Sequence, residues 1–399
     1  MSAGIAAGGM SRHVCLVSEE AAPNITPVLD SAVRPDGVIL VVAPGMERRA
    51  RWLGRVLREG AGVQVYPWPV ADAWDIEYLI GCFMELLERH EDLTLNATGG
   101  TRPMSIAAFE AFRAYERPVF YVHPYTDDLF WLYPHDRPRH QLADRIKLRH
   151  FLMAHGAEIK AHGEVSVPPA CRELTAYLIL RIEALGRALG ALNWYAASAR
   201  DTLASAPIRD DHLHWPEFLE LVARFQAVDA LRFKGDRLIF PSESNRFFVN
   251  GGWLEEHVYD QVQRLRRRLP LIQDVARSLL VARNTRRGAV ENELDVAFLA
   301  NNRLYLIECK TRRFRPDEAD EEGPGAEAIY KLDTLKELLG GLHAKGMLVS
   351  CLPLAEADRR RAADLGIRVC EGRQIQDLPH ILHQWIMAGT GAHNISTAD

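Results

Sequence analysis

Residues 291–310, ENELDVAFLANNRLYLIECK, decide the fold of the C-terminal part of this chain. Apolar residues recur at every second position on both sides of the pair Asn301-Asn302, as expected for two β-strands. Asparagine tolerates the positive φ that a two-residue hairpin turn requires, so we expect the chain to reverse at this pair. The resulting register predicts three apolar pairs on one face: Phe298 with Tyr305, Val296 with Ile307, and Leu294 with Cys309.

The opposite face of the expected hairpin carries charges. Asp295 opposes Glu308, and Glu293 opposes Lys310. Cβ atoms at opposed positions lie about 4.5–5.5 Å apart, where two like charges destabilise a sheet. A divalent cation between the carboxylates would remove this repulsion, and oxygen ligands suit Mg²⁺ or Mn²⁺. The ammonium group of Lys310 would activate a water molecule or stabilise developing negative charge. The alternative is a solvated strand face with scattered charges, because Glu-x-Lys is common on strands.

These residues resemble the Asp…Glu-x-Lys core of the PD-(D/E)xK nucleases, the restriction-endonuclease-like family. That family also carries a glutamate on a helix upstream of the hairpin, and here Glu255 follows Gly251-Gly252, with Glu256 as the competing candidate. Leu294 stands where the family often has proline. The resemblance implies that Asp295, Glu308 and Glu255 hold Mn²⁺ or Mg²⁺ and that Lys310 orients or deprotonates the attacking water. Secondary candidates are Glu256, Glu293 and Lys331.

The N-terminal part of the chain alternates short apolar runs with helical patterns. The apolar runs are residues 13–18, 38–43, 63–66, 93–96, 118–123 and 129–133. Helical patterns separate them at residues 47–58, 74–89 and 103–115, whereas residues 19–27 are expected to form a loop. This alternation predicts an α/β, doubly wound and mostly parallel sheet, in which ligands bind beyond the carboxyl ends of the strands.

Three loops at that edge are candidate binding segments, namely residues 18–24, 43–46 and 96–104. The third reads NATGGTRPM, and its glycines allow the backbone to approach a ligand at a helix N-terminus that favours anions. Arg102 adds a cation suited to phosphate. An ordinary strand-to-helix turn would also use glycine for tightness. The loop matches neither G-x-G-x-x-G nor a Walker A motif, which argues against the usual nucleotide-binding folds.

A serine in the loop after the first strand, with Asn-x-Thr-Gly-Gly-Thr-Arg-x-Met after the fourth, resembles the CARF domain. CARF domains are CRISPR-associated Rossmann-fold sensors of cyclic oligoadenylates, and the resemblance covers residues 11–140. It implies the following ligand-binding residues: Ser18, Asn24, Pro44, Gly45, Met46, Asn96, Thr98, Gly99, Gly100, Thr101, Arg102 and Met104. A CARF domain ahead of a PD-(D/E)xK domain is the architecture of the ancillary nucleases of type III CRISPR systems.

Residues 141–249 are expected to connect the two domains as a helical and mixed segment. Residues 174–197 are apolar on most sides, which indicates one or two buried helices and a candidate dimer element. A helix at 215–225 followed by two short strands suggests a winged-helix-like piece, and its acidic helix favours a packing role over DNA reading. The α/β nuclease domain is expected over residues 250–390, with a helix at 326–339 and strands at 347–351 and 367–370.

The bulk composition limits the cellular setting. The chain has 399 residues and a net charge of −5, so any nucleic-acid-binding surface must be local. No apolar run is long enough to span a membrane, and no secretory signal is present. The six cysteines show no CxxC spacing, which predicts reduced thiols in a cytoplasmic protein and no disulfide frame or zinc site.

The two resemblances together imply a metal-dependent endonuclease of type III CRISPR antiviral defence. Cyclic tetra-adenylate is the favoured activator, bound at a two-fold site of a homodimer, and the substrate is single-stranded or duplex DNA or RNA. Two alternatives stay open: a ligand-sensing transcriptional regulator with an idle C-terminal domain, and a ring nuclease that degrades its own activator. The sequence does not decide the strandedness or base preference of the substrate, the metal, the activator's ring size, or which arginines contact substrate.

Overall fold

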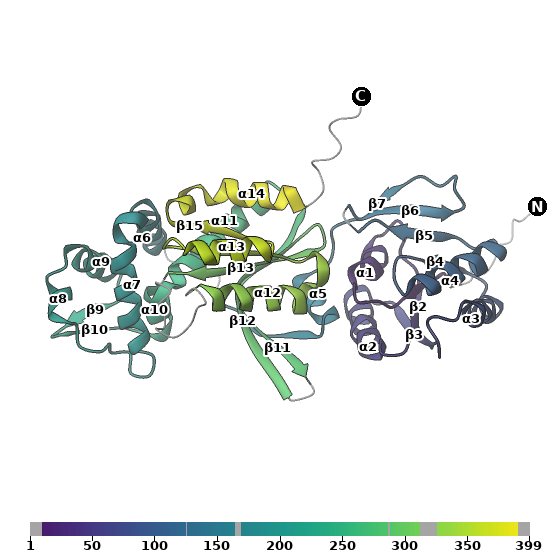
Figure 1. Cartoon of the computed structure of the whole chain (residues 1–399), viewed down its shortest axis with the longest axis horizontal. Helices are drawn as coiled ribbons and strands as arrows, with labels where there is room; N and C mark the ends of the chain where they lie inside the picture. Colours follow the sequence, from purple (N-terminus) through teal and green to yellow (C-terminus); the bar gives the residue numbers. More distant parts are fainter. Residues whose placement is uncertain (1–9, 125, 164–168, 286–287, 312–324, 390–399) are drawn as a thin grey trace, which may run out of the picture.

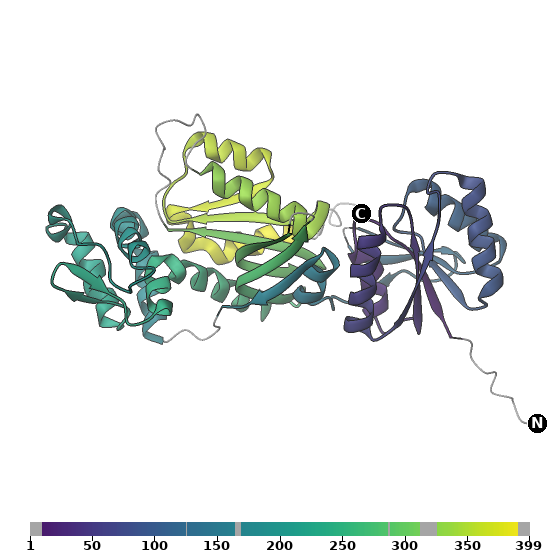
Figure 2. The ribbon, with the colours of Figure 1, turned by 90° about the horizontal axis from the view of Figure 1, so that it is seen from below.

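The computed structural model describes residues 10–124, 126–163, 169–285, 288–311 and 325–389. These residues form three parts along the longest axis of the molecule (Figure 1). An N-terminal α/β part lies at one end, a second α/β part lies in the centre, and a mainly helical part lies at the other end. Figure 2 shows the same order from below. No helix among the described residues is long and apolar enough to cross a membrane.

The N-terminal part is built on a seven-stranded sheet in the order β3-β2-β1-β4-β5-β6-β7. The strands are β1 (Arg12–Leu16), β2 (Gly37–Val42), β3 (Gln64–Pro69), β4 (Leu93–Asn96), β5 (Val119–Val122), β6 (Asp128–Tyr133) and β7 (His140–Gln141). The first five strands are parallel to one another, β6 pairs antiparallel with β5, and β7 pairs antiparallel with β6. The expected mostly parallel sheet is therefore confirmed, and the carboxyl ends of β1 and β4 lie side by side.

Helices cover both faces of this sheet. They are α1 (Ala22–Leu29), α2 (Glu47–Val56) continued by η1 (Leu57–Ala61), α3 (Ile76–Arg89) and α4 (Arg102–Ala114). The expectation of a loop at residues 19–27 is wrong, because α1 occupies most of it. Pro23 lies in its first turn, where an amide has no partner in the helix, and the buried side chains of Ile25 and Val28 offset the proline inside the helix.

The central part contains a six-stranded sheet in the order β15-β14-β13-β12-β11-β8. Its strands are β8 (Ala157–Ala161), β11 (Ile272–Thr285), β12 (Gly288–Ala300), β13 (Arg303–Lys310), β14 (Lys345–Ser350) and β15 (Ile367–Glu371). Its helices are α5 (Leu148–Ala154), α11 (Trp253–Arg266), α12 (Ala326–Gly340), α13 (Glu356–Asp364) and α14 (Leu378–Gly389), with short turns η3 (Gly341–His343) and η4 (Gly372–Asp377). Strands β8 and β11 were not predicted, since β8 lies in a stretch expected to be mainly helical and charged residues interrupt β11.

The hairpin of β12 and β13 turns where the sequence predicts. Asn301 and Asn302 have φ values of 50° and 53°, and Phe298 opposes Tyr305, with their rings stacked 4.8 Å apart. The ladder ends at the pair Val296–Ile307, so the further pairs expected from the sequence do not belong to it. The sequence predicted that Leu294 shares one face with Val296 and Phe298. This prediction is wrong, because Leu294 packs into the core on the other face of the sheet.

In sequence, the third part lies between β8 and α11 of the central part. It comprises α6 (Pro169–Leu180), α7 (Ile182–Ser198), α8 (Asp210–Leu213), α9 (Pro216–Ala227), β9 (Arg232–Lys234), β10 (Arg237–Ile239), α10 (Glu243–Phe247) and η2 (Phe248–Gly252). The apolar stretch at 174–197 is thus two helices, one of the two outcomes expected. A helix followed by a small antiparallel pair, β9 and β10, is also present.

Two hydrophobic cores join these parts. One combines α7 and α9 of the helical part with α11, α14 and one face of the central sheet. The other combines α1, α2 and β2 of the N-terminal part with α12 and the opposite face of the central sheet. Because this second core is continuous across both α/β parts, a shift in α1 or α2 would also move residues against β12 and β13.

Candidate nuclease and ligand-binding sites

The charged residues expected at the nuclease site come from four elements. Glu255 lies in the first turn of α11, Asp295 on β12, Glu308 and Lys310 on β13, and Lys331 on α12. They meet where the β12–β13 ladder ends. There the carboxylate of Asp295 replaces a backbone partner, because its Oδ2 accepts a hydrogen bond of 2.7 Å from the amide of Cys309.

Glu308 is the centre of an ion-pair network. Its side chain is 3% exposed, and its Oε1 lies 2.5 Å from Nζ of Lys310 and 3.1 Å from Nζ of Lys331. Burial acts to lower the pKa of Lys310, but Glu308 and Asp295 outweigh it and raise this pKa above its usual value. Lys310 is therefore a cation at neutral pH, which suits charge stabilisation better than deprotonation of water.

Asp295 is buried and Glu255 is half-buried in the same cluster, and both have raised pKa values. Burial, followed by the nearby charge of Glu308, raises the pKa of Asp295 to about 7. Burial, followed by Asp295, raises the pKa of Glu255 to about 9, against a hydrogen bond from Ser278 that lowers it. Near neutral pH Glu255 is therefore protonated and Asp295 is partly protonated, and a cation bound here would replace these protons.

The two neighbouring candidates, Glu256 and Glu293, occupy different environments. Glu256 faces away from this cluster and pairs with Arg277 of β11 at 3.0 Å. Glu293 is exposed, although its charge contributes to the raised pKa of Glu255. The geometry therefore favours Glu255 over Glu256 as the helical carboxylate of the cluster.

The donor set fits a hard divalent cation in chemistry. Three carboxylates with raised pKa values or cationic partners provide oxygen ligands, which Mg²⁺ and Mn²⁺ prefer. Among the described residues, no three His, Cys, Asp or Glu side chains are close enough together to hold a metal without moving. Glu308 is paired with Lys310 and Lys331, so a metal ion would compete with these two ammonium groups for its carboxylate.

The loop at residues 96–104 lies beyond β4, as expected. A Cβ atom on Gly99 would collide with the carbonyl oxygen of Leu16, and Gly100 has a φ of 75°. Both positions therefore require glycine. Thr101 caps α4 by accepting a hydrogen bond from the amide of Met104, and Arg102 is exposed at the start of that helix. Exposed cation and helix N-terminus together form a surface that attracts phosphate.

Two of the expected binding residues, Asn24 and Asn96, have structural positions. Each is 1% exposed, and Nδ2 of Asn96 donates to Oδ1 of Asn24 at 3.0 Å. Nδ2 of Asn24 also donates to the carbonyl of Leu16, and Oδ1 of Asn96 accepts from Thr98. These amides tie the loops after β1 and β4 to each other. Met104 is fully buried under the loop as well.

The other expected binding residues lie at the surface of the same edge. Ser18 is half-buried and donates to the carbonyl of Glu20 at 3.1 Å. Pro44 and Gly45 are exposed after β2, and Met46 is half-buried beside them. The three loops are therefore brought together at one sheet edge, as the sequence predicts for a ligand site of a doubly wound fold.

A buried polar network connects this N-terminal part to the nuclease hairpin. Nδ2 of Asn302, in the hairpin turn, donates to Oδ2 of Asp127 at 3.1 Å and to Oδ1 of Asp144 at 3.2 Å. Its Oδ1 accepts from Gln273 of β11 at 2.5 Å. Thr98 of the ligand loop is separately tied to the end of β5, because its Oγ1 accepts a hydrogen bond of 2.9 Å from the amide of Val122. No sequence pattern indicated this network.

Two further contacts join the loops at the sheet edge to the central part. The carboxylate of Glu20 accepts a hydrogen bond of 3.0 Å from the amide of Leu342, which follows α12. Arg48 of α2 donates to the carbonyl of Asn284 near the end of β11, at 2.9 Å. These contacts link the loop after β1 and helix α2 directly to the central part.

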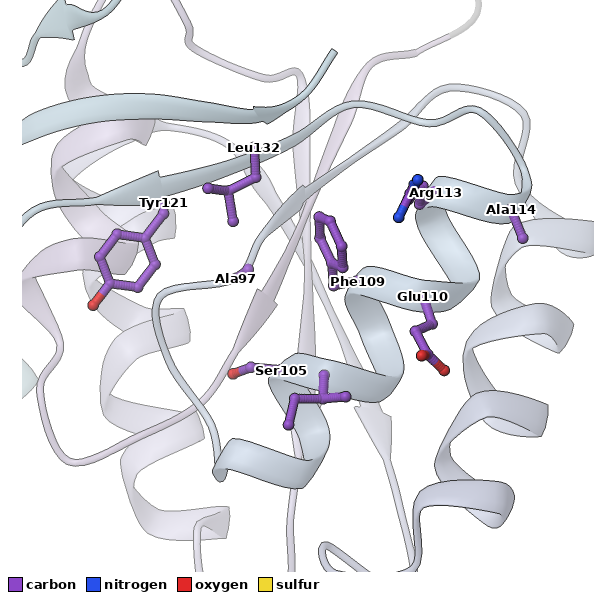
Figure 3. A pocket seen from close by; sticks show the side chains of 9 residues that line it. Ala97, Ser105, Phe109, Glu110, Arg113, Ala114, Tyr121 and Leu132 are labelled. Carbon is purple, nitrogen blue, oxygen red and sulfur yellow. The ribbon is translucent and has the colours of Figure 1, made fainter. Parts of the chain in front are cut away.

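A hollow of about 630 Å³ lies between α4 and the strands β5 and β6 (Figure 3). Phe109 and Ser105 of α4 face Tyr121 of β5 and Leu132 of β6 across it. Ile106, next to this hollow, is 52% exposed, and Tyr121 is 36% exposed. Exposed apolar side chains beside the ligand loop are typical of an association surface.

Family models and solved structures match both α/β parts. A model described as the Card1 CARF domain matches residues 12–151, and one described as the Card1-like endonuclease domain matches residues 242–389. The crystal structure of protein VC1899 from Vibrio cholerae is 31% identical, with a TM-score of 0.86 over 96% of this chain and 99% of that one. This chain belongs to the Card1-like family of CARF nucleases. The resemblance inferred from the sequence and the predicted fold class are thereby confirmed.

A second similar structure carries a ligand. Can2 from Sulfobacillus thermosulfidooxidans, in complex with cyclic tetra-adenylate, is 28% identical, with a TM-score of 0.79 over 94% of this chain and 99% of that one. A type III CRISPR defence DNA nuclease activated by cyclic oligoadenylate shares the fold, at 19% identity and a TM-score of 0.52, over 88% of this chain and 47% of that one. A comparison with curated proteins found no match.

Proposed function

We propose that this Card1-like protein is a metal-dependent endonuclease that cyclic tetra-adenylate activates, with DNA, RNA or both as substrate, in type III CRISPR defence. The observation that carries the proposal is the buried cluster of Glu255, Asp295, Glu308 and Lys310 at the end of the β12–β13 ladder. The likeness over nearly the full chain to Can2, solved with cyclic tetra-adenylate, supports this activator.

The roles of the nuclease residues follow from their geometry. Asp295, Glu308 and Glu255 would hold Mn²⁺ or Mg²⁺, which when bound supplies an activated water and neutralises phosphate charge. The water oxygen would form a bond to phosphorus as its proton passes to solvent. The bond from phosphorus to the leaving sugar oxygen would break, and that oxygen would take up a proton from solvent. Lys310, kept cationic by its carboxylate neighbours, stabilises the negative charge that develops on the phosphoryl oxygens. Lys331 holds Glu308 in the absence of the metal.

The division of labour along the chain is part of the proposal. Residues 11–140 would sense the ligand, residues 141–249 would connect, and residues 250–390 would cleave, with β8 of the connector adding an edge strand to the nuclease sheet. Ser18, Gly45, Thr98 and Arg102 would contact the activator from the three loops at the sheet edge. Asn24 and Asn96 would support those loops from below.

We also propose that the protein works as a homodimer in the cytoplasm. The apolar hollow and the exposed Ile106 on α4 lie directly beside the ligand loop, so a second copy on this surface would bring two loops to one ligand. A two-fold ligand such as cyclic tetra-adenylate suits two related loops. The six cysteines are free thiols, as a reducing compartment requires.

A cleavage assay with a panel of nucleic acids tests the proposal. Single-stranded DNA, single-stranded RNA and supercoiled plasmid are each incubated with the protein, with Mn²⁺, Mg²⁺ or chelator, and with or without cyclic tetra-adenylate. We expect cleavage of at least one substrate only when activator and metal are both present. Tight activator binding without cleavage of any substrate would overturn the nuclease assignment and favour a ligand-sensing regulator.

A further inference from the structure

Strand β11 contains one residue whose backbone does not follow the strand. β11 extends over 14 residues, yet Ser278 in its middle has a φ of 45°. This left-handed conformation is uncommon for any residue other than glycine and costs about 1–3 kcal/mol. Such strain persists only where the surrounding structure holds it, and it concentrates at functional sites.

The alternation of side chains between the two faces of the sheet is broken next to Ser278. On the neighbouring strand, Val296 packs against the core that contains α11, whereas Leu294 packs into the core on the opposite face. Residues two apart on a regular strand share one face, so the alternation is broken between them. The ladder pairs Arg277 with Val296 and Leu279 with Leu294. By this register Ser278 lies opposite Asp295, and both stand at the break.

The break turns two consecutive side chains of β11 toward α11. Arg277 forms its 3.0 Å ion pair with Glu256, and Oγ of Ser278 donates a 3.1 Å hydrogen bond to Oε2 of Glu255. On a regular strand these neighbours would point to opposite faces. The positive φ of Ser278 therefore allows β11 to hold both consecutive glutamates of α11.

A glycine on the adjacent segment accommodates Ser278. Gly163 follows β8, and its amide donates to the carbonyl of Arg277 at 3.2 Å. A Cβ atom on Gly163 would lie 2.7 Å from Cβ of Ser278, closer than real Cβ contacts. An alanine at position 163 would therefore displace Ser278 from its present position.

We infer that Ser278 is a positioning residue that fixes the carboxylate of Glu255 for metal binding. The inference rests on the proposed function. The hydroxyl holds Oε2 of Glu255 at 3.1 Å, on the carboxylate that the proposed function assigns to the metal. Hydrogen bonds of this kind orient metal ligands, and their removal costs about 10- to 100-fold in metal affinity.

The test compares Mn²⁺ binding by calorimetry, without nucleic acid, in the full-length wild type and in Ser278→Gly. Glycine accepts the positive φ, so this change removes the hydroxyl without adding backbone strain. We expect Mn²⁺ affinity to fall about 10- to 100-fold, while the melting temperature and the affinity for cyclic tetra-adenylate stay unchanged. Gly163→Ala should weaken Mn²⁺ binding in the same direction, since it displaces Ser278 and leaves the hydroxyl present.

Two outcomes overturn the inference in distinguishable ways. If Ser278→Gly binds Mn²⁺ and cleaves nucleic acid as the wild type does, Ser278 does not position Glu255. Glu255→Gln is the reference variant, because it removes the ligand charge itself. If Glu255→Gln also binds Mn²⁺ as the wild type does, the metal role proposed for Glu255 is wrong, and the role of Ser278 falls with it.

Discussion

The turn of the nuclease hairpin is the most specific point at which to test the connection between the two domains. Replacing Asn302 with glycine keeps its left-handed φ of 53° and removes the amide that binds Asp127, Asp144 and Gln273. Each buried hydrogen bond contributes about 0.5–1.5 kcal/mol, and more when its partner is charged. Burial raises the pKa of Asp127 to about 6 and of Asp144 to about 7, so both are partly neutral at pH 7. We therefore expect a loss of about 2–4 kcal/mol from the three bonds.

The assay has two readouts. Thermal unfolding reports the loss of stability, and cleavage with and without cyclic tetra-adenylate reports the activation factor. Because Asn302 joins the hairpin to the CARF domain, we expect the activation factor to fall by about 5- to 150-fold, the usual range of a coupling free energy. By reciprocity, nuclease-site occupancy should then affect activator affinity less than in the wild type.

The matched control is Asn301→Gly, the neighbouring turn residue with a φ of 50°. It introduces the same glycine freedom into the unfolded chain at the same turn. If both variants have the same melting temperature and both retain the wild-type activation factor, the polar network of Asn302 neither stabilises the junction nor transmits activation.

Three further outcomes follow from individual contacts. Gly99→Ala should weaken cyclic tetra-adenylate binding at least about 10-fold, as a lost positioning contact does, because the added Cβ atom meets a carbonyl of β1. The control is Gly81→Ala, whose Cβ atom meets nothing within 4 Å. Equal affinities of the two variants for the ligand would contradict the prediction. Asp144→Asn should stabilise the protein by about 1–3 kcal/mol more at pH 8 than at pH 4. A carboxyl whose pKa is raised from 3.8 to about 7 by burial destabilises the fold as the pH rises through that window; a pH-independent effect in denaturation curves would exclude the burial argument. Lys331→Met should tighten Mn²⁺ binding by up to about fivefold in calorimetry, because the ammonium group, which is 39% exposed, no longer competes for Glu308. Weaker Mn²⁺ binding by this variant would show that Lys331 helps to bind the metal.

Local patterns in the sequence were sufficient where the chemistry is local. Alternation around Asn301-Asn302 gave the turn and the first pairs of the hairpin, because both residues accept a left-handed φ. The loop NATGGTRPM was placed correctly at a helix start because glycine and a capping threonine are needed there. These signals identified both domains before the comparisons did.

Contacts between distant segments left no such trace. The register of β12 breaks at Asp295, where a side chain takes the place of a ladder bond, so Leu294 packs opposite to its expected face. Nothing near Ser278 predicts a left-handed residue in a long strand, since Gly163, which accommodates it, lies more than a hundred positions away. The link through Asn302 likewise depends on residues from three separate segments.

The measurement that tests the central claim most directly compares the wild type with the double variant Glu308→Ala and Lys310→Ala. Calorimetry gives the affinity of each protein for cyclic tetra-adenylate, and the cleavage assay gives the metal-dependent rate with saturating activator. We expect the two proteins to have equal or nearly equal affinities for cyclic tetra-adenylate, and cleavage to be lost only in the double variant. Cleavage by the double variant would contradict the assigned nuclease site. An equal cleavage rate of the wild type with and without cyclic tetra-adenylate would contradict activation by this ligand.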